Sequence, residues 1–377
     1  VWKKELKEEE VNMQIKCNVL DRQFQMYQTE YEEAALRVLR SGWYVLGNEV
    51  RQFEQEFAEF TGRKYCVGLN SGLDALIMSV RALGIGKGDE VIVQANTYIA
   101  TVLGITENDA IPVFVEPDEY FNIDADKIEQ AITDRTKAIM VTHLYGQASN
   151  MTPIMEIAQR YHLEIIEDCA QSHGACFGGR MTGTFGISGC FSFYPTKNLG
   201  AFGDAGAIVT DDAAFAEKIR MMRNYGSKVK YHNEIEGVNS RLDEMQAALL
   251  RVKLTHLQEL NDERKVLAKR YSDGIINPEI KLPGLREKAE SIYHQYVVRC
   301  AEREDLQRAL EQNGVQTQIH YPIPPHLAKC YAFLGYQRGA YPVTEAYAES
   351  VLSLPLYTGM TFAEQDYVIE QINAWKP

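Results

Sequence analysis

The stretch KYCVGLNSGLDALIMSVRALG, from Lys64 to Gly84, combines two periodicities. Its first part, KYCVGL, is a short apolar run of the kind that forms a buried strand, and its second part has the spacing of a helix. Asn70, Ser71 and Gly72 form a turn between them. A strand followed at once by a helix is the repeating unit of a parallel sheet, so this stretch predicts an α/β fold.

The same alternation continues along the chain as far as Asp168. The further apolar runs are 89–94, 111–115, 137–146 and 163–168, and the helical segments are 73–84, 98–108, 124–133 and 151–162. Short apolar strands that alternate with helices indicate a mostly parallel sheet covered on both faces. Such an open, doubly wound sheet binds its ligands at the carboxyl ends of the strands.

The pattern changes on either side of this region. Helical spacing also occurs at 30–42, 49–62, 213–226 and 240–275, and a strand at 293–300 precedes a helix at 303–314. We therefore predict three parts: an N-terminal extension over 1–12, a large ligand-binding domain over 13–259 and a smaller C-terminal α+β domain over 260–377.

The composition argues against several classes of protein. The chain has 377 residues, 45% of them hydrophobic and 24% charged, and a net charge of -13, which disfavours nucleic acid as a partner. No apolar run is long enough to span a membrane, and the charged start VWKKELKEEEVN lacks the apolar core of a signal peptide. The seven cysteines form no CxxC pair, so we expect reduced thiols, a cytoplasmic protein and no metal site.

An anion site is predicted where the strand 64–69 ends. The free N–H groups at the start of the next helix and the positive end of its dipole favour an anion beside Ser71 and Gly72. Gly72 allows close approach of the backbone, and Ser71 adds a hydroxyl group. An ordinary helix N-cap at Ser71 is the alternative, and it is the more common explanation of this pattern alone.

Two chemically reactive side chains follow other strands. Asp168 ends the apolar run 163–168, where a carboxylate needs a cationic or proton-donating partner, and Glu167 faces the other way by strand alternation. Lys197 lies in the loop of FSFYPTKNLGAFGDAGAI, residues 191–208, between two apolar runs. Loops placed in this way present functional groups.

An amine, a carboxylate and an anion site at one sheet edge suit pyridoxal phosphate. Lys197 would form the Schiff base with its aldehyde, and Asp168 would keep its ring nitrogen protonated. Ser71 and Gly72 would hold the phosphate with the help of the Ser192 hydroxyl. Tyr98 would stack on the ring, although a core aromatic residue is its alternative.

Four motifs carry a family resemblance. NSGLDAL, EDCAQSHGA, FSFYPTKNLGAFGDAGAI and GVNSRLDEMQAALL resemble, in order, the sugar aminotransferases of the DegT/DnrJ/StrS family, over nearly the whole chain from Met13. The resemblance implies the aspartate-aminotransferase fold (fold type I) and pyridoxal 5'-phosphate as cofactor. By position, Lys197 resembles the Schiff-base lysine, Asp168 the partner of the pyridine nitrogen, and Gln171 the residue beside the phenolic oxygen. The phosphate ligands and stacking residue correspond to Ser71, Gly72, Ser192 and Tyr98.

The resemblance also implies an assembly and a reaction. Members of the family are homodimers with shared active sites, which the GVNSRL segment of the partner completes, here through Asn239 and Arg241. A surface salt bridge of Arg241 with Asp243 is the alternative. Lys197 stands where a dehydrating branch of the family carries histidine, so transamination is implied, with glutamate as the amino donor.

The substrate is expected to be a dTDP-linked 3-keto-6-deoxyhexose, aminated at C-3. Gln171, His143 and Tyr145 are similar to the 3-aminotransferase branch. The expected substrate-binding residues are Tyr231, His320, Tyr321 and His326, and turn packing is the alternative for the two histidines. Other candidate functions are a 4-amino-sugar aminotransferase, an aminotransferase for a cyclitol or aminobenzoate-type ring, and a non-catalytic regulator that binds pyridoxal phosphate.

Overall fold

The computed structural model describes residues 13–377, so the predicted extension over 1–12 lies outside it. Its centre is a seven-stranded sheet. In spatial order the strands are β1 (Tyr65–Leu69), β9 (Gly206–Thr210), β8 (Ser188–Ser192), β5 (Glu164–Asp168), β4 (Thr136–Thr142), β2 (Glu90–Gln94) and β3 (Ile111–Val115). Only β9 runs antiparallel to its neighbours in this sheet, so the predicted mostly parallel sheet is confirmed.

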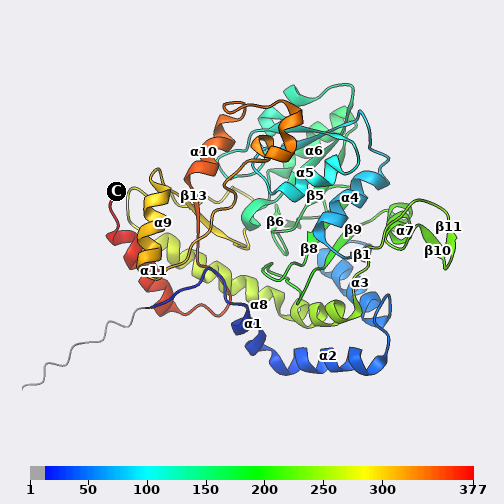
Figure 1. Cartoon of the computed structure of the whole chain (residues 1–377), viewed down its shortest axis with the longest axis horizontal. Coiled ribbons are helices and arrows are strands. Elements are labelled where there is room, and N and C mark those ends of the chain that lie inside the picture. The colour runs from blue at the N-terminus through cyan, green and yellow to red at the C-terminus, as the bar shows by residue number, and fades with distance from the viewer. Residues whose placement is uncertain (1–12) are drawn as a thin grey trace, which may run out of the picture.

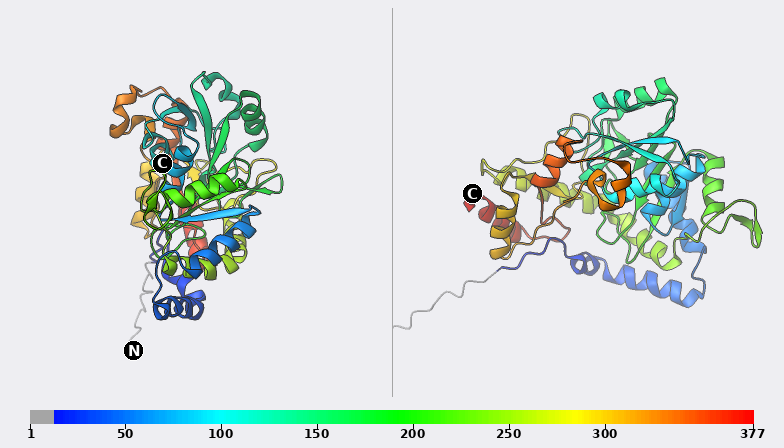
Figure 2. Two further views of the ribbon diagram at one scale, coloured as in Figure 1. Left: turned by 90° about the vertical axis from the view of Figure 1, so that its right-hand side faces the viewer. Right: turned by 45° about the horizontal axis from the view of Figure 1, so that its top comes forward.

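Helices cover both faces of the sheet (Figure 1, Figure 2). One face packs against α4 (Gly72–Ala82), α5 (Ile99–Thr106) and α7 (Ala213–Met222), and the other against α3 (Asn48–Thr61), α6 (Met151–Tyr161) and α8 (Glu244–Gly274). Successive residues of β2 point in opposite directions: Val91 and Val93 join the first core, while Ile92 joins the second. This explains why the strands are continuous apolar runs.

One predicted helix is wrong. The segment 124–133 forms two short 3-10 turns, η1 (Ala125–Lys127) and η2 (Glu129–Ala131). The chain is tied down at both ends, because Ile123 donates its N–H to Gln94 Oε1 and the Thr133 hydroxyl donates to Glu90 Oε2. These two ties to β2 leave no room for a continuous helix.

The C-terminal part has its own apolar core, and α8 runs from the sheet into it (Figure 1). Ile15 belongs to this core and forms a bridge with Val315, so the N-terminal segment packs on the C-terminal part. The predicted boundary at 259/260 falls within α8, and the division into domains stays a prediction.

The remaining elements are α1 (Leu20–Met26), α2 (Gln28–Ser41), η3 (Leu144–Gly146), β6 (Cys176–Phe177), β7 (Arg180–Met181), β10 (Ser227–Val229), β11 (His232–Asn233), β12 (Tyr296–Arg299), α9 (Arg303–Gln312), η4 (Pro325–Leu327), η5 (Lys329–Leu334), α10 (Pro342–Ser350), β13 (Val351–Leu354) and α11 (Phe362–Ala374).

Within residues 13–377 the structure has neither a membrane-spanning helix nor a disulfide bond. None of the helices in this range combines the length and the apolar character needed to cross a membrane. All seven cysteines lie in it and are free thiols.

Candidate active site

A cavity of about 660 Å³ lies where β1, β2, β4, β5 and β8 reach their carboxyl ends. That volume is in the range of small-molecule binding sites. The C-terminal part closes it with residues that precede β12 and follow α9. Of the predicted site residues, the cavity lining contains Ser71, Gly72, Tyr98, Asp168, Gln171, Ser192, Lys197, His320 and Tyr321.

The anion site forms because three chain segments approach one another closely. Gly206, at the start of β9, pairs with Leu69 and with Ser192, so the ends of β1 and β8 meet there. A Cβ added to Gly72 would lie 2.5 Å from the Cβ of Ser192, which only glycine avoids. Ser71 caps α4 by accepting the N–H of Asp74 over 3.0 Å, which leaves its own hydroxyl hydrogen free to donate. The N-cap and the anion site are therefore compatible functions of Ser71.

Asp168 is buried, with 5% of its surface exposed, and it is held by hydrogen bonds. The Thr101 hydroxyl donates to Oδ2 over 2.7 Å, and the backbone N–H of Ala170 donates to Oδ1 over 3.1 Å. Burial raises the pKa of Asp168, while these two donors and the charge of Lys197 act in the opposite direction. A buried carboxylate with a free face toward the cavity can stabilise a protonated nitrogen of a ligand.

Lys197 lies in the loop after β8 and lines the same cavity. Its backbone N–H donates to the carbonyl of Tyr194 over 2.8 Å, which closes a turn. Burial lowers the pKa of its amine to about 8, and Asp168 partly opposes this effect. An amine that loses its proton near pH 8 is a better nucleophile and proton carrier at physiological pH than an ordinary lysine.

Three histidines around Lys197 are kept neutral. Burial, followed by the charge of Lys197, lowers the pKa of His173 to about 3 and that of His320 to about 4. The same two causes lower the pKa of His294 well below its ordinary value. At neutral pH the cationic side chain that faces Asp168 in this wall of the cavity is therefore Lys197.

Gln171 organises the opposite wall. Its Oε1 accepts the backbone N–H of Tyr145 over 2.6 Å, and its Nε2 donates to the Tyr321 hydroxyl over 3.1 Å. The ring of Tyr98 lies 4.9 Å from that of Tyr321, and Tyr98 is half exposed, so it is not a core aromatic residue. Tyr145 itself donates its hydroxyl to the carbonyl of His320. These contacts link the sheet edge to the segment that contains His320 and Tyr321.

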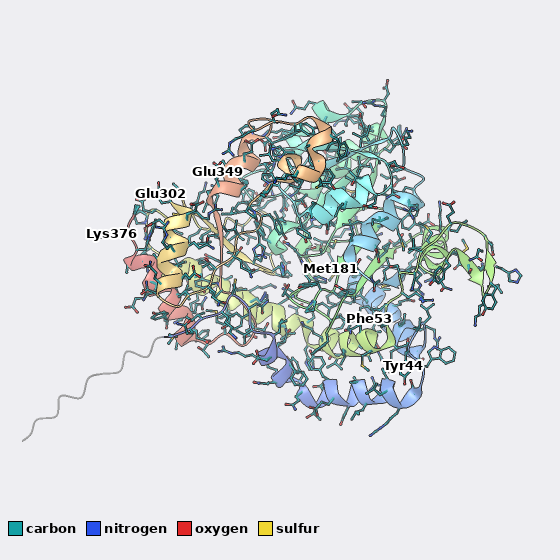
Figure 3. All side chains as sticks on the ribbon, viewed as in Figure 1. Tyr44, Phe53, Met181, Glu302, Glu349 and Lys376 are labelled. Atoms are coloured by element: carbon teal, nitrogen blue, oxygen red, sulfur yellow. The ribbon has the colours of Figure 1, made fainter. Side chains whose placement is uncertain are left out.

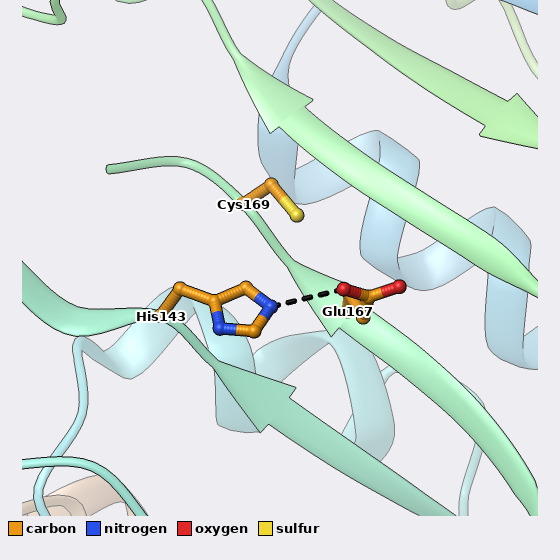
Figure 4. A group of neighbouring side chains, drawn as sticks. All are labelled: His143, Glu167 and Cys169. Carbon is orange, nitrogen blue, oxygen red and sulfur yellow. Dashed lines mark hydrogen bonds and ion pairs between the residues drawn. The ribbon is translucent and has the colours of Figure 1, made fainter. Parts of the chain in front are cut away.

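His143, Glu167 and Cys169 lie behind the cavity and have the composition of a metal site (Figure 4). The ligand atoms of His143 and Glu167 already have partners. Nδ1 of His143 accepts the N–H of Ser149 over 3.0 Å, which leaves Nε2 to donate to Glu167 Oε2 over 3.0 Å. Glu167 also accepts three backbone N–H groups, those of Gly183, Phe185 and Gly186. The pair of His143 and Glu167 is therefore a hydrogen-bonded support for the segment between β7 and β8.

Burial alone would raise the pKa of Glu167. The hydrogen bond from His143 and the backbone donors lower that pKa below its ordinary value instead. Glu167 and Asp168 have different hydrogen-bond partners on opposite sides of β5, as strand alternation predicts, and their pKa values shift in opposite directions.

One predicted substrate contact, His326, is packed in the interior of the chain. His326 is 1% exposed and does not line the cavity. Its Nε2 lies 3.1 Å from Glu345 Oε1, and its ring packs against Phe114 and Tyr341. The turn-packing alternative therefore describes His326, because the proline-rich segment folds inward at η4.

Three other predicted residues lie outside the cavity of their own chain. Asn239 is exposed and forms a bridge with Asn224, whose side chain also accepts a hydrogen bond from Arg241. Tyr231 is 85% exposed on the hairpin of β10 and β11, which projects from the body of the molecule (Figure 1, Figure 2). Their predicted roles stay predictions.

The sequence did not identify three residues of the site. Thr101 holds Asp168, and His294 and Gln295 line the cavity from the C-terminal part. Thr101 follows Tyr98 by one helical turn, which is the only sign that it shares the cavity edge. His294 and Gln295 precede a strand of another region, so no sequence spacing relates them to Lys197.

Comparisons with known proteins agree with this geometry. A model of the DegT/DnrJ/EryC1/StrS aminotransferase family matches residues 25–373. A curated relative, the dTDP-3-amino-3,6-dideoxy-alpha-D-galactopyranose transaminase of Aneurinibacillus thermoaerophilus, is 51% identical over 350 residues, which cover 93% of this chain and 96% of the relative.

Two solved structures are similar over most of the chain. The crystal structure of S. venezuelae DesV in complex with a ketimine intermediate has a TM-score of 0.94 and 44% identity, and the match covers 96% of this chain and 98% of that chain. The crystal structure of NtdA from Bacillus subtilis with bound cofactor PMP has a TM-score of 0.89 and 34% identity, and the match covers 97% of this chain and 86% of that chain. The predicted fold is thereby confirmed.

Proposed function

The chain belongs to the DegT/DnrJ/EryC1/StrS aminotransferase family, and we propose that it transfers an amino group from glutamate to C-3 of a dTDP-linked 3-keto-6-deoxyhexose. The product is a 3-amino-3,6-dideoxy sugar nucleotide. The observation that carries this proposal is the meeting of Lys197, Asp168 and the Ser71–Gly72 turn in one cavity.

The protein is a transaminase that depends on pyridoxal 5'-phosphate. The residues present fit this cofactor. The contact of Gly72 with Ser192 forms a cradle with hydroxyl and backbone donors for a phosphate, and Asp168 is an acceptor for a protonated ring nitrogen. Lys197 provides the amine for attachment. When bound, the cofactor supplies an electron sink for the bonds at the carbon that carries the nitrogen.

The remaining chemistry belongs to the side chains. With the cofactor bound, Lys197 Nζ would accept a proton at one carbon and return it at another. Asp168, held by Thr101, would keep the ring nitrogen protonated. Gln171 would donate from Nε2 toward the phenolic oxygen, and Tyr98 would cover one face of the ring. His320 and Tyr321 line the cavity and would contact the substrate.

Amination at C-3 is supported by the relative that is 51% identical, which is named for a 3-amino-3,6-dideoxy sugar. Recognition of a sugar hydroxyl by hydrogen bonds requires polar groups in fixed positions. The contacts of Gln171 with Tyr145 and Tyr321 fix the cavity wall that these residues form. Glutamate as donor, and an O-antigen or S-layer glycan as destination, are parts of the same proposal. The free cysteines support a cytoplasmic location.

A homodimer with shared sites is also part of the proposal. Trp43 and Tyr44 are exposed in the loop after α2, and Tyr225 is exposed beside Arg241. Figure 3 labels Tyr44 in this loop. The loop lies next to the start of α8, because the Tyr44 carbonyl accepts the N–H of Glu244 over 3.1 Å. Exposed aromatic residues grouped in this way indicate a protein interface. A partner on this surface would place Asn239 and Arg241, and with them the β10–β11 hairpin carrying Tyr231, beside the cavity of the other subunit.

The test offers the 3-keto and 4-keto dTDP-6-deoxy sugars with glutamate and locates the new amine by NMR. We expect amination at C-3. Amination only at C-4 would favour the 4-amino-sugar alternative, and transfer only to a cyclitol or aminobenzoate-type ring would favour the second alternative. Binding of the cofactor without any transfer would favour the regulator.

A further inference from the structure

One side chain of α8 connects the two loops that contain Asp168 and Lys197. Oδ1 of Asn261 accepts a hydrogen bond of 2.8 Å from Asn198 Nδ2, and Asn198 directly follows Lys197. Nδ2 of Asn261 donates a hydrogen bond of 2.9 Å to the carbonyl of His173, in the loop after Asp168. The Asn261 amide thus binds the Lys197 loop through its oxygen and the loop after Asp168 through its nitrogen.

The connection is buried and closely packed. Asn261 is 2% exposed and Asn198 is 5% exposed, so water does not compete for these hydrogen bonds. Gly174 has φ +94°, and a Cβ at this position would lie 3.0 Å from Asn261 Nδ2. The loop after Asp168 therefore lies directly against the amide group.

The same Asn198 side chain also reaches the cavity wall. Its Oδ1 lies 3.0 Å from Nδ1 of His294, which lines the cavity. Because Oδ1 can only accept, His294 donates from Nδ1. A displacement of Asn198 would therefore move both the Lys197 loop and this histidine.

Helix α8 provides a rigid base for the connection. One face of it presents Lys253, Leu257, Asn261 and Arg264, which are spaced by three or four residues. Lys253 Nζ donates to the carbonyl of Gly200, in the Lys197 loop, over 3.3 Å. Arg264 donates to the carbonyls of His294 and Leu356, each over 3.0 Å. The helix thus holds the loop at Asn198 and at Gly200, and it holds the cavity wall at His294.

We propose that Asn261 is a positioning residue that sets the placement of the Lys197 amine relative to the Asp168 carboxylate. The inference rests on the functions proposed for these two residues. The two loops are separate segments of the chain. Hydrogen bonds from one common side chain therefore fix the distance between them. Small displacements of a reacting group reduce rate strongly while leaving the binding of substrate largely intact.

The experiment compares Asn261→Ala with Leu267→Ala. Leu267 is buried on the same helix but packs in the C-terminal core, which contains no residue of either loop, so its truncation destabilises α8 without removing a contact of the two loops. In cofactor-free protein, the pH dependence of acetic anhydride labelling at Lys197, measured by peptide mass spectrometry, reports the pKa of its amine. We expect Asn261→Ala to raise that pKa from about 8 toward the ordinary value of a lysine, because the loosened loop admits water.

In the holoenzyme, Asn261→Ala should lower kcat about tenfold with KM within about twofold. Leu267→Ala should lower the melting temperature and leave the Lys197 labelling profile unchanged. If Asn261→Ala does not fold, Asn198→Ala breaks the same bond from the other side and should give the same shift. In a double-mutant cycle, Asn198→Ala with Asn261→Ala should shift the labelling profile no further than the larger single change.

The inference would be overturned if Asn261→Ala and Asn198→Ala lowered the melting temperature but kept the labelling profile and kcat of wild type. Asn261 would then contribute only to stability. The labelling comparison does not require a particular substrate. Its outcome is therefore separate from the outcome of the amination test at C-3.

Discussion

The hydroxyl of Thr101 donates a 2.7 Å hydrogen bond to Oδ2 of Asp168. Thr101 comes from α5 and Asp168 from the end of β5, so the bond joins two neighbouring parts of the sheet edge. The Thr101 hydroxyl lies 2.7 Å from that of Thr97, which lies 3.2 Å from that of Thr142. This buried chain of hydroxyl groups fixes the direction in which Asp168 points.

Replacement of Thr101 by valine should reduce turnover about tenfold or more. A hydrogen bond to a charged group contributes about 1.5–3 kcal/mol, and its loss would raise the pKa of Asp168 further. Thr101→Ser keeps the hydroxyl and serves as the control. Steady-state kinetics with both variants checks the prediction, and equal turnover of Thr101→Val and wild type would contradict it.

Asp168→Asn should retain the fold and much of the cofactor but lose about tenfold or more in turnover. An amide cannot provide the negative charge that keeps the ring nitrogen protonated. Cofactor content is measured by absorbance after release, and turnover is measured in the same preparation. Wild-type turnover in a fully loaded variant would remove Asp168 from the mechanism.

The cofactor-free protein should become more stable as the pH rises from about 8 to about 10.5, through the contribution of Lys197. In this window the unfolded chain binds a proton at Lys197 that the folded chain does not, so the free energy of unfolding increases with pH. Lys197→Met should show a smaller increase, because only the buried Lys253, whose pKa burial lowers to about 7, then contributes in this window. Lys137→Met, which replaces an exposed lysine, should keep the full increase. Urea unfolding at several pH values gives the slopes, and identical slopes for the three proteins would contradict the lowered pKa.

Activity should return when two inactive variants form mixed dimers. Lys197→Ala lacks the amine, and Asn239→Ala lacks the residue that we expect to complete the partner's cavity. A heterodimer has one cavity with both lesions and one cavity with neither, so partial activity is expected from differently tagged and co-purified subunits. Two individually inactive variants whose verified heterodimers recover no activity would count against shared sites.

The sequence predicted those features that depend on neighbours in the chain. The turn at Ser71 and Gly72 and the position of Asp168 at the end of β5 follow from strand and helix patterns, and the structure has both. The helix predicted over 124–133 failed because its shape depends on ties to Gln94 and Glu90 of β2, which periodicity does not report.

Features that depend on contacts between distant segments could not be predicted. Thr101, Asn261 and His294 have no motif of their own, and they matter because the fold brings them to Asp168, Asn198 and the cavity. His326 shows the opposite case, since a histidine on a proline-rich segment suggested a binding surface and is buried against Glu345.

We infer that Lys197 is the residue that holds the cofactor. Reduction of the holoenzyme with borohydride, followed by proteolysis and peptide mass spectrometry, identifies the attached lysine. We expect one reduced adduct, on Lys197, and no adduct in Lys197→Ala, which should still bind the cofactor without transferring an amino group. An adduct on any other lysine, such as the buried Lys253, would show that Lys197 does not have this role.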